Sequence, residues 1–218
     1  MDLRAAWEAE AERWLAWTRT PGHDHWFSNW NWPAFVDLLP PPGGRTLDLG
    51  CGEGRCGRWL AEHGHAVTGV DGSPTLADHA RAAGGYDEVL CADVAALPFP
   101  DASFDLVCAF MSLHDVDDLD GAVAELRRVL EPGGRLAAAL YHPQSSAGYG
   151  EGGYDTPHRW EMTIERGGLE MTFHSMHRPL SDYLEALAGA GLVLEELREP
   201  VGDGYESTLF LHLTAVAG

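Results

Sequence analysis

The feature that most constrains this chain is a buried-strand pattern that runs directly into a glycine-rich loop, over residues 46–55 (TLDLGCGEGR). Glycine occupies every second position of the loop, at Gly50, Gly52 and Gly54. Without a Cβ, the backbone there can turn tightly and come close to a ligand. Helical patterning resumes at Arg55, so the amides of the first helical turn favour an oxygen-rich or anionic group. We therefore expect a small ligand at the carboxyl end of the first strand.

The spacing of the glycines bears on the identity of that ligand. A dinucleotide fingerprint, G-x-G-x-x-G, counted from Gly50 and Gly52 would place its third glycine at position 55, where this chain has arginine. Asp48 stands inside the strand, where the dehydrogenase pattern has an apolar residue. A carboxylate at that point is better suited to ordering loop amides or receiving a cationic group than to tolerating a pyrophosphate. The missing third glycine and the carboxylate of Asp48 therefore argue against an NAD(P)-dependent oxidoreductase.

A second acidic residue, Asp71, ends the next strand pattern and is followed by Gly72 and Ser73. It lies about twenty residues beyond the glycine loop, where a carboxylate can accept both hydroxyls of a ribose. Dinucleotide enzymes share this placement with other nucleoside-binding folds. Asp71 therefore supports an adenosine-containing ligand. It does not distinguish a dinucleotide enzyme from a protein with another nucleoside-binding fold.

The strand, the G-x-G-x-G loop and the segment 97–105 (LPFPDASFD) together resemble class I S-adenosylmethionine-dependent methyltransferases of the small-molecule type. The resemblance runs from about Arg45 to the C-terminus, apart from an inserted hairpin. It implies an α/β fold with a Rossmann-like, mostly parallel sheet of seven strands in the order 3-2-1-4-5-7-6, flanked by helices. It also implies S-adenosyl-L-methionine as cofactor, with S-adenosyl-L-homocysteine as product.

The resemblance further implies which residues hold the cofactor. Asp48 would support the loop and the methionine end, the loop would pass under the sulfonium and ribose, and Asp93 with the amide of Val94 would bind adenine. Met111 and Leu113 would form walls beside the methionine part. The expected cofactor-binding residues are Asp48, Gly50, Cys51, Gly52, Gly54, Asp71, Gly72, Ser73, Asp93, Val94, Met111 and Leu113.

Histidines provide the candidate bases. His114 follows the fourth predicted strand, and an imidazole that titrates near neutrality can remove a proton from a phenol or hydroxyl during methyl transfer. A structural or cofactor-positioning role is the alternative for this residue. His142 follows the fifth predicted strand, on the crevice side of the sheet. His174 and His177 are secondary candidates and are expected to be ordinary surface residues. No cluster of metal ligands is expected.

The remaining segments suggest how the chain is organised around the core. Residues 3–17 have the apolar spacing of an amphipathic helix, whereas the aromatic-rich stretch 20–33 is neither a good helix nor a good strand. Glu131–Gly134 is expected to be a turn into the fifth strand. Two alternating runs around Gly167-Gly168 predict a β-hairpin after that strand.

We expect a single domain over residues 1–218, in four parts. Residues 1–42 would be a helical and aromatic cap and 43–144 the cofactor-binding core. Residues 145–178 would be a lid and hairpin on the acceptor side, and 179–218 the last part of the core. The glycine-rich start of the third part, 145–155, could act as a mobile lid.

The amino-acid composition limits the classes of substrate and partner that we expect for this chain. The chain has 34 acidic and 14 basic residues, the latter all arginine, for a formal charge of -20, so nucleic acid is an unfavourable substrate. There is no bilayer-length apolar run and no secretion-signal pattern at the N-terminus, so a cytoplasmic protein without a membrane partner is expected. The four cysteines form no C-x-x-C pair, which favours free, buried thiols. A monomer or homodimer is expected.

The sequence thus predicts an enzyme that moves a methyl group from S-adenosylmethionine to an oxygen, nitrogen or carbon atom of a small acceptor. The aromatic cap suggests a planar or apolar acceptor. A non-catalytic protein that binds the cofactor as a structural ligand or sensor remains open, because the loops report binding and not turnover.

Overall fold

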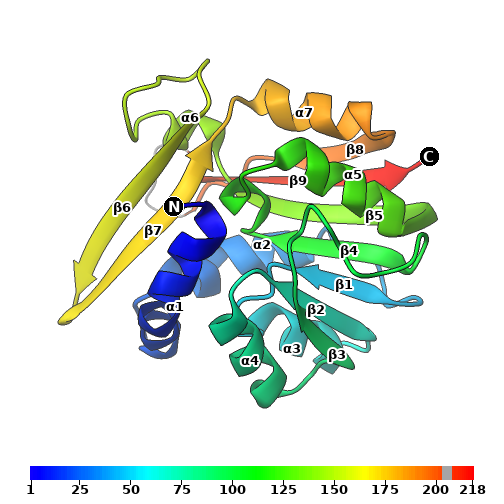
Figure 1. Cartoon of the computed structure of the whole chain (residues 1–218), viewed down its shortest axis with the longest axis horizontal. Coiled ribbons are helices and arrows are strands. Elements are labelled where there is room, and N and C mark those ends of the chain that lie inside the picture. Colours follow the sequence, from blue (N-terminus) through cyan, green and yellow to red (C-terminus); the bar gives the residue numbers. More distant parts are fainter. Residues whose placement is uncertain (203–207) are drawn as a thin grey trace.

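Within residues 1–202 and 208–218, which the computed structural model describes, a seven-stranded sheet runs in the order β3-β2-β1-β4-β5-β9-β8 (Figure 1). The first five of its strands in chain order are parallel, and β9 lies antiparallel between β5 and β8. The predicted order is confirmed once the strands of the separate hairpin are left out of the numbering. The strands are β1 (Thr46–Leu49), β2 (Val67–Asp71), β3 (Glu88–Cys91), β4 (Phe104–Phe110), β5 (Leu130–Tyr141), β8 (Leu192–Arg198) and β9 (Phe210–Ala217).

Helices cover both faces of this sheet, which is why β1 and β2 are buried at every residue. Apolar side chains of α5 and α7 pack on one face and those of α2 and α3 on the other, while α4 packs against β2 and β3. No helix among the described residues is both long and apolar enough to cross a membrane. The helices are α1 (Leu3–Arg19), α2 (Trp32–Val36), α3 (Arg55–Glu62), α4 (Pro74–Ala83), α5 (Leu119–Val129), α6 (Pro143–Ser146) and α7 (Leu180–Gly189), with a π-helical turn η1 (Phe27–Asn31) and a 3-10 turn η2 (Leu113–Asp115).

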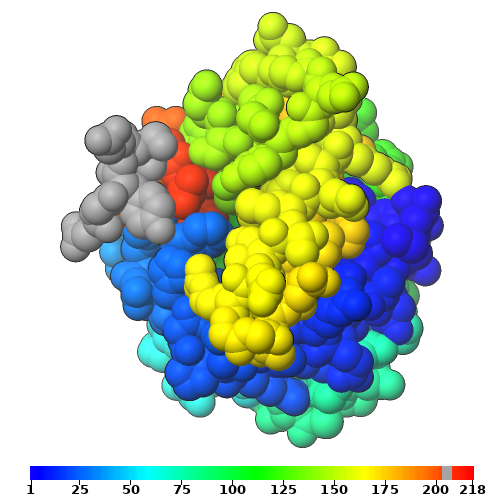
Figure 2. Space-filling view, turned by 90° about the vertical axis from the view of Figure 1, so that its left-hand side faces the viewer, coloured from blue at the N-terminus to red at the C-terminus, as the bar shows by residue number. Residues whose placement is uncertain are grey.

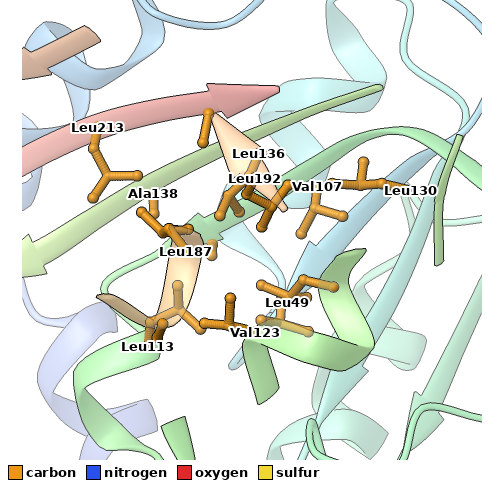
Figure 3. Close-up of a cluster of buried hydrophobic side chains, with 14 of the residues drawn as sticks. Leu49, Val107, Leu113, Val123, Leu130, Leu136, Ala138, Leu187, Leu192 and Leu213 are labelled. Atoms are coloured by element: carbon orange, nitrogen blue, oxygen red, sulfur yellow. The ribbon is translucent and has the colours of Figure 1, made fainter. Parts of the chain in front are cut away.

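The larger apolar core lies between the sheet and the α5–α7 layer (Figure 3). Leu49 and Val107 reach it from β1 and β4, and Val123 and Leu187 reach it from α5 and α7. These side chains are almost fully buried, and burial of a leucine or valine contributes about 1.5–3 kcal/mol. This core fixes the strand ends from which the loops of the candidate site emerge.

A two-stranded hairpin, β6 (His158–Arg166) and β7 (Leu169–His177), stands apart from the main sheet at the end where β5 stops (Figure 1). Gly167 and Gly168 have φ values of +58° and +80°, the left-handed conformation that a two-residue hairpin turn requires. β7 packs against α1, and Figure 2 shows the hairpin in yellow against the blue N-terminal segment. The predicted hairpin is confirmed, and with α1 it forms a roof over one end of the sheet.

The structure corrects three local expectations. The aromatic stretch 20–33 is largely helical, because its rings pack on the core: Phe27 stacks on Trp32 at 5.6 Å between ring centroids. Residues 131–134, expected as a turn, belong to β5, whose register shifts against β4. Of the four cysteines, all free, Cys91 is exposed and the other three are buried as expected.

Candidate active site

A cavity of about 550 Å³ opens at the carboxyl ends of the parallel strands, where open α/β sheets bind ligands. Its floor includes the glycine loop after β1, the turn after β2, the segment after β3 and the turn after β4. Trp7 and Trp14 of α1 and Trp160 and Phe173 of the hairpin line it from the roof. The volume falls in the range of small-ligand sites.

The glycine loop needs its glycines for two different reasons. Gly50 has a φ of +67°, and a Cβ there would lie 2.4 Å from Cβ of Ser112. Gly52 has a φ of +56°, and a Cβ there would meet only Trp14 Nε1, at 3.7 Å, within 4 Å. Gly50 therefore permits close packing of two loops, whereas Gly52 leaves open a cradle that a side chain would fill.

Asp71 is tied to that loop. Its Oδ2 accepts the amide of Gly52 and its Oδ1 accepts the amide of Ser73, both at 2.8 Å. Burial raises the pKa of this carboxyl, and the amides of Ser73 and Gly52 act in the opposite direction. Each oxygen keeps a second lone pair, so the carboxylate can still accept two ligand hydroxyls. Gly72 and Ser73 line the cavity beside it.

The segment after β3 forms the next part of the floor. Asp93 and Val94 both line the cavity. Asp93 Oδ1 accepts the amide of Ala95 at 3.0 Å, and its Oδ2 lies 3.5 Å from Nη1 of Arg4 on α1. The second contact is an exposed ion pair that links the roof to the floor, and such pairs contribute little to stability.

Asp48 lies beneath the loop and does not line the cavity. It is only 1% exposed, and its Oδ2 accepts the hydroxyl of Tyr86 at 2.7 Å. Burial raises the pKa of Asp48 to about 7, against the opposing effect of the Tyr86 hydrogen bond. Gly54 also faces this tyrosine instead of the cavity: a Cβ on Gly54 would lie 3.0 Å from the Tyr86 ring. Asp48 and Gly54 therefore contact Tyr86 below the cavity floor, and neither lines the cavity.

Some residues of the turn after β4 line the cavity, and others are buried in the core. Met111 lines the cavity and has a φ of +56°, which is rare for a residue with a side chain. Leu113, expected as a cavity wall, is instead buried in the larger core, next to Val123 (Figure 3). The chain turns between these two positions, so Met111 lines the cavity and Leu113 does not.

Comparison with known proteins places this geometry in a family. A methyltransferase domain model matches residues 47–138. A solved structure of an S-adenosylmethionine-dependent methyltransferase from Mesorhizobium loti is 30% identical, covers 85% of this chain and 97% of its own, and has a TM-score of 0.68. The chain belongs to the S-adenosylmethionine-dependent methyltransferases. The family assignment confirms the expected cofactor class, and the open cradle at Gly52 beside Asp71 fits a nucleoside ligand.

Two curated relatives are similar in sequence to part of this methyltransferase chain. Malonyl-(acyl-carrier protein) O-methyltransferase of Enterobacter lignolyticus is 41% identical over 93 residues, which are 43% of this chain and 37% of the relative. The 2-methyl-6-phytyl-1,4-hydroquinone methyltransferase of a Synechocystis species is 32% identical over 163 residues, 72% of this chain and 49% of the relative. The matched stretches therefore span less than half the length of either relative.

His114 lines the cavity of the methyltransferase but is poorly placed to accept a proton. Its Nδ1 accepts the amide of Tyr141 at 3.4 Å, and its Nε2 lies 3.6 Å from Oδ1 of Asp115. Because Nδ1 is an acceptor, the proton of the neutral ring is assigned to Nε2. Burial, and secondarily the charge of Arg178, lower the pKa of His114 to about 3. A neutral ring whose Nδ1 already accepts a backbone amide, and whose pKa lies far below neutrality, fits a positioning role better than a general base.

The other histidines are held in different surroundings. His142 does not line the cavity: its Nδ1 accepts the amide of Gln144 at 3.0 Å as the cap of α6, and its Nε2 lies 2.8 Å from Oε1 of Glu199. His177 is fully buried, with Nδ1 2.7 Å from Oγ of Ser146, so the expectation of a surface residue is wrong. His174 lies at the cavity, with Nδ1 3.5 Å from a carboxylate oxygen of Glu161.

Sequence reasoning missed an ion pair in the cavity wall. Arg55, at the start of α3, pairs with Asp24 at 2.6 Å, and its guanidinium lies 3.6 Å from the centroid of the Phe27 ring. All three line the cavity. The only sequence signal was the arginine that replaces the third glycine of a dinucleotide loop.

Aromatic side chains from distant segments meet on the side of the cavity away from Asp71 and Asp93. Tyr141 lies 5.5 Å from Trp160 between ring centroids, and Phe210 lies 6.1 Å from Tyr141. Tyr149 stacks on Trp160 from behind, at 4.9 Å and 25°. We call the cavity-lining members of this cluster the acceptor chamber: Trp26, Met111, Tyr141, Trp160, Met162 and Phe210.

Proposed function

We propose that this chain transfers the methyl group of S-adenosylmethionine to a small aromatic or apolar acceptor. The observation that carries the proposal is a single cavity with two differently built parts. One part has the glycine loop, Asp71 and Asp93, and the other is the acceptor chamber. A cofactor held by the first part would present its methyl group toward a molecule in the second.

The proposed reaction requires the protein mainly to position the methyl donor and the acceptor. When bound, S-adenosylmethionine supplies a methyl group that is already activated on its sulfonium. The chain would hold donor and nucleophile in line and exclude water from the contact. We assign the ribose contact to Asp71, the adenine contact to Asp93 and Val94, and the wall beside the methyl group to Met111. The roof formed by α1 and the hairpin would exclude water.

The acceptor chamber supports a flat and uncharged acceptor. Its six side chains carry no formal charge, and planar rings pack well against aromatic walls. The relative named for a phytyl hydroquinone acts, by its name, on a ring of this kind. We therefore favour phenolic or quinol acceptors.

We further propose that residues 1–218 act as a single domain, that the protein works in the cytoplasm as a monomer or homodimer, and that nucleic acid is not a substrate. The formal charge of -20 supports the last point, because such a surface repels phosphate backbones. The close packing of α1 on β7 and α4 supports treating cap, core and hairpin together.

A titration followed by a turnover assay tests the proposal. We expect S-adenosylhomocysteine to bind with a Kd in the micromolar range, about -8 kcal/mol, and NADH not to bind. A panel of phenols, hydroquinones and amines is then incubated with S-adenosylmethionine, and S-adenosylhomocysteine is quantified. Binding without turnover of any acceptor would favour a sensor or structural role. NADH binding alone would overturn the proposal.

Trp160 provides the sharper test of the acceptor chamber. Trp160→Ala removes a ring that lines the chamber and supports Tyr149, so we expect KM for the acceptor to rise at least tenfold while the cofactor Kd changes less than twofold. Trp59→Ala is the matched control, since Trp59 lies on α3, stacks on His63 and does not line the cavity. Equal effects of both substitutions on acceptor KM would contradict the assignment.

A further inference from the structure

The ring of Tyr86 occupies a slot made by three glycines from three different elements. A Cβ on Gly57 of α3 would lie 2.1 Å from this ring, one on Gly69 of β2 2.8 Å, and one on Gly54 of the loop 3.0 Å. None of these positions leaves room for a side chain while the ring is there. The slot brings the Tyr86 hydroxyl to Asp48 at 2.7 Å.

The surroundings of Asp48 are unusual for a carboxylate. The titratable groups that face it are acids and thiols: Asp71 from β2, Glu53 and Cys51 from the loop, Cys56 from α3 and Cys108 from β4, together with Tyr86. A buried charge normally needs a cationic partner or several hydrogen bonds. The phenol of Tyr86 supplies one such bond, and the Gly57 amide contributes a weaker one.

Asp48 lies directly below the cavity floor. Cys51 and Cys56, which feel its charge, both line the cavity. A negative charge at this depth is screened little by solvent, so it acts on a charged ligand above the loop. S-adenosylmethionine carries a sulfonium cation, whereas its product S-adenosylhomocysteine has a neutral thioether. The two share all other groups.

We propose that Tyr86 is a positioning residue that keeps Asp48 charged beneath the glycine loop, and that this pair lets the site bind the sulfonium cofactor in preference to its thioether product. The inference rests on the proposed function only through the identity of the cofactor. It assigns Tyr86, which does not line the cavity, a role in the relative affinity of the site for cofactor and product.

The direction of the acid–base chemistry agrees with this role. Burial raises the pKa of Asp48 to about 7, so its charge is present above that pH and is lost below it. Burial also raises the pKa of the Tyr86 phenol, so its hydroxyl remains a donor throughout. Removing the hydroxyl would raise the pKa of Asp48 further, because the bond favours the charged form.

The test is a calorimetric titration of both ligands at pH 5.5, 6.5, 7.5 and 8.5. In the unaltered protein, we expect the ratio of the S-adenosylhomocysteine Kd to the S-adenosylmethionine Kd to rise at least threefold across this range. Tyr86→Phe keeps the ring in its slot, and should lower that ratio at pH 7.5 at least threefold and shift its rise to higher pH. Asp48→Asn should make the ratio independent of pH.

Tyr183→Phe is the matched control, since Tyr183 is a buried tyrosine on α7 that does not line the cavity, and this substitution should leave the ratio unchanged. Equal weakening of both ligands in Tyr86→Phe would show a merely structural role and overturn the inference. A pH-dependent ratio that survives in Asp48→Asn would assign the effect to Asp71 and also overturn it. If neither ligand binds the unaltered protein, the proposed function fails instead.

Discussion

The backbone amide of Tyr141 donates to Nδ1 of His114 across 3.4 Å, and this contact joins the end of β5 to the turn after β4. Through this contact His114, the first candidate base, accepts a hydrogen bond from the main chain. The ring still lines the cavity, where its N–H side can orient a ligand or a neighbouring side chain. The position of a histidine beside a reacting group therefore does not by itself make it a base.

Replacement of His114 by glutamine should lower kcat less than about tenfold and leave the pH–rate profile unchanged above pH 5, because a group with a pKa of about 3 does not titrate there. The measurement is kcat and kcat/KM between pH 5 and 9. Loss of an inflection near pH 6.5 in the variant would restore His114 as the base.

Asp71→Asn should weaken S-adenosylhomocysteine binding at least tenfold, because the amide loses one of the two acceptors available to ribose. It should also lower the free energy of unfolding by about 1–2 kcal/mol, since the amide group can accept only one of the Gly52 and Ser73 bonds. Calorimetry and urea unfolding measure the two effects. The control is Asp78→Asn on the exposed side of α4; equal effects in both variants would contradict the contact.

Gly57→Ala and Gly189→Ala form a matched pair of helix substitutions. A Cβ on Gly57 meets the Tyr86 ring at 2.1 Å, whereas one on Gly189 meets nothing within 4 Å. We expect Gly57→Ala to destabilise by about 1–3 kcal/mol or more through overpacking, and Gly189→Ala to be neutral or stabilising by up to about 1 kcal/mol. Urea unfolding compares them. Similar stabilities for the two variants would mean that the ring does not fill its slot.

His212 should make the fold sensitive to acid. Burial, and secondarily Arg198, lower the pKa of His212 to about 4, while its Nε2 lies 2.7 Å from Oδ1 of Asn31. The unfolded chain therefore binds the proton first, so stability falls as pH drops from about 6.5 to about 4, by up to about 3 kcal/mol from this residue. Unfolding free energies at pH 4 to 7 should fall less steeply in His212→Gln. The control His79→Gln, at a half-buried site on α4, should keep the full slope.

The parallel core was predictable because its signals are local. Strands and helices alternate with glycine and proline boundaries, and Ser73 with Pro74 marks the start of α4, where the Ser73 hydroxyl accepts the amide of Leu76 at 3.1 Å. The hairpin was predictable for the same reason, since alternation and a Gly-Gly turn define it. The aromatic stretch 20–33 was misjudged because packing overrode its weak local preference.

The candidate site was only partly predictable, because its roof is assembled from distant segments. The glycine loop, Asp71 and Asp93 could be placed by their distance from strand ends. The place of Leu113 could not be predicted, because a shift of one or two residues within the turn moves a side chain from the cavity to the core. The slot of Tyr86 was invisible, because Gly57 and Gly69 read in the sequence only as isolated small residues.

The roof of the cavity has a consequence for the order in which the molecule assembles. α1 precedes the sheet, but it packs on β7, and the amide of Leu3 reaches Asp117 across 114 positions of sequence. Contacts that close so long a loop form late, and segments that depend on them open with less free energy than the paired sheet. We therefore expect ligands to exchange through a partially open state in which β1 to β5 remain folded. The segment that we propose excludes water during the reaction is thus also one that we expect the chain to release at a lower cost than the paired sheet.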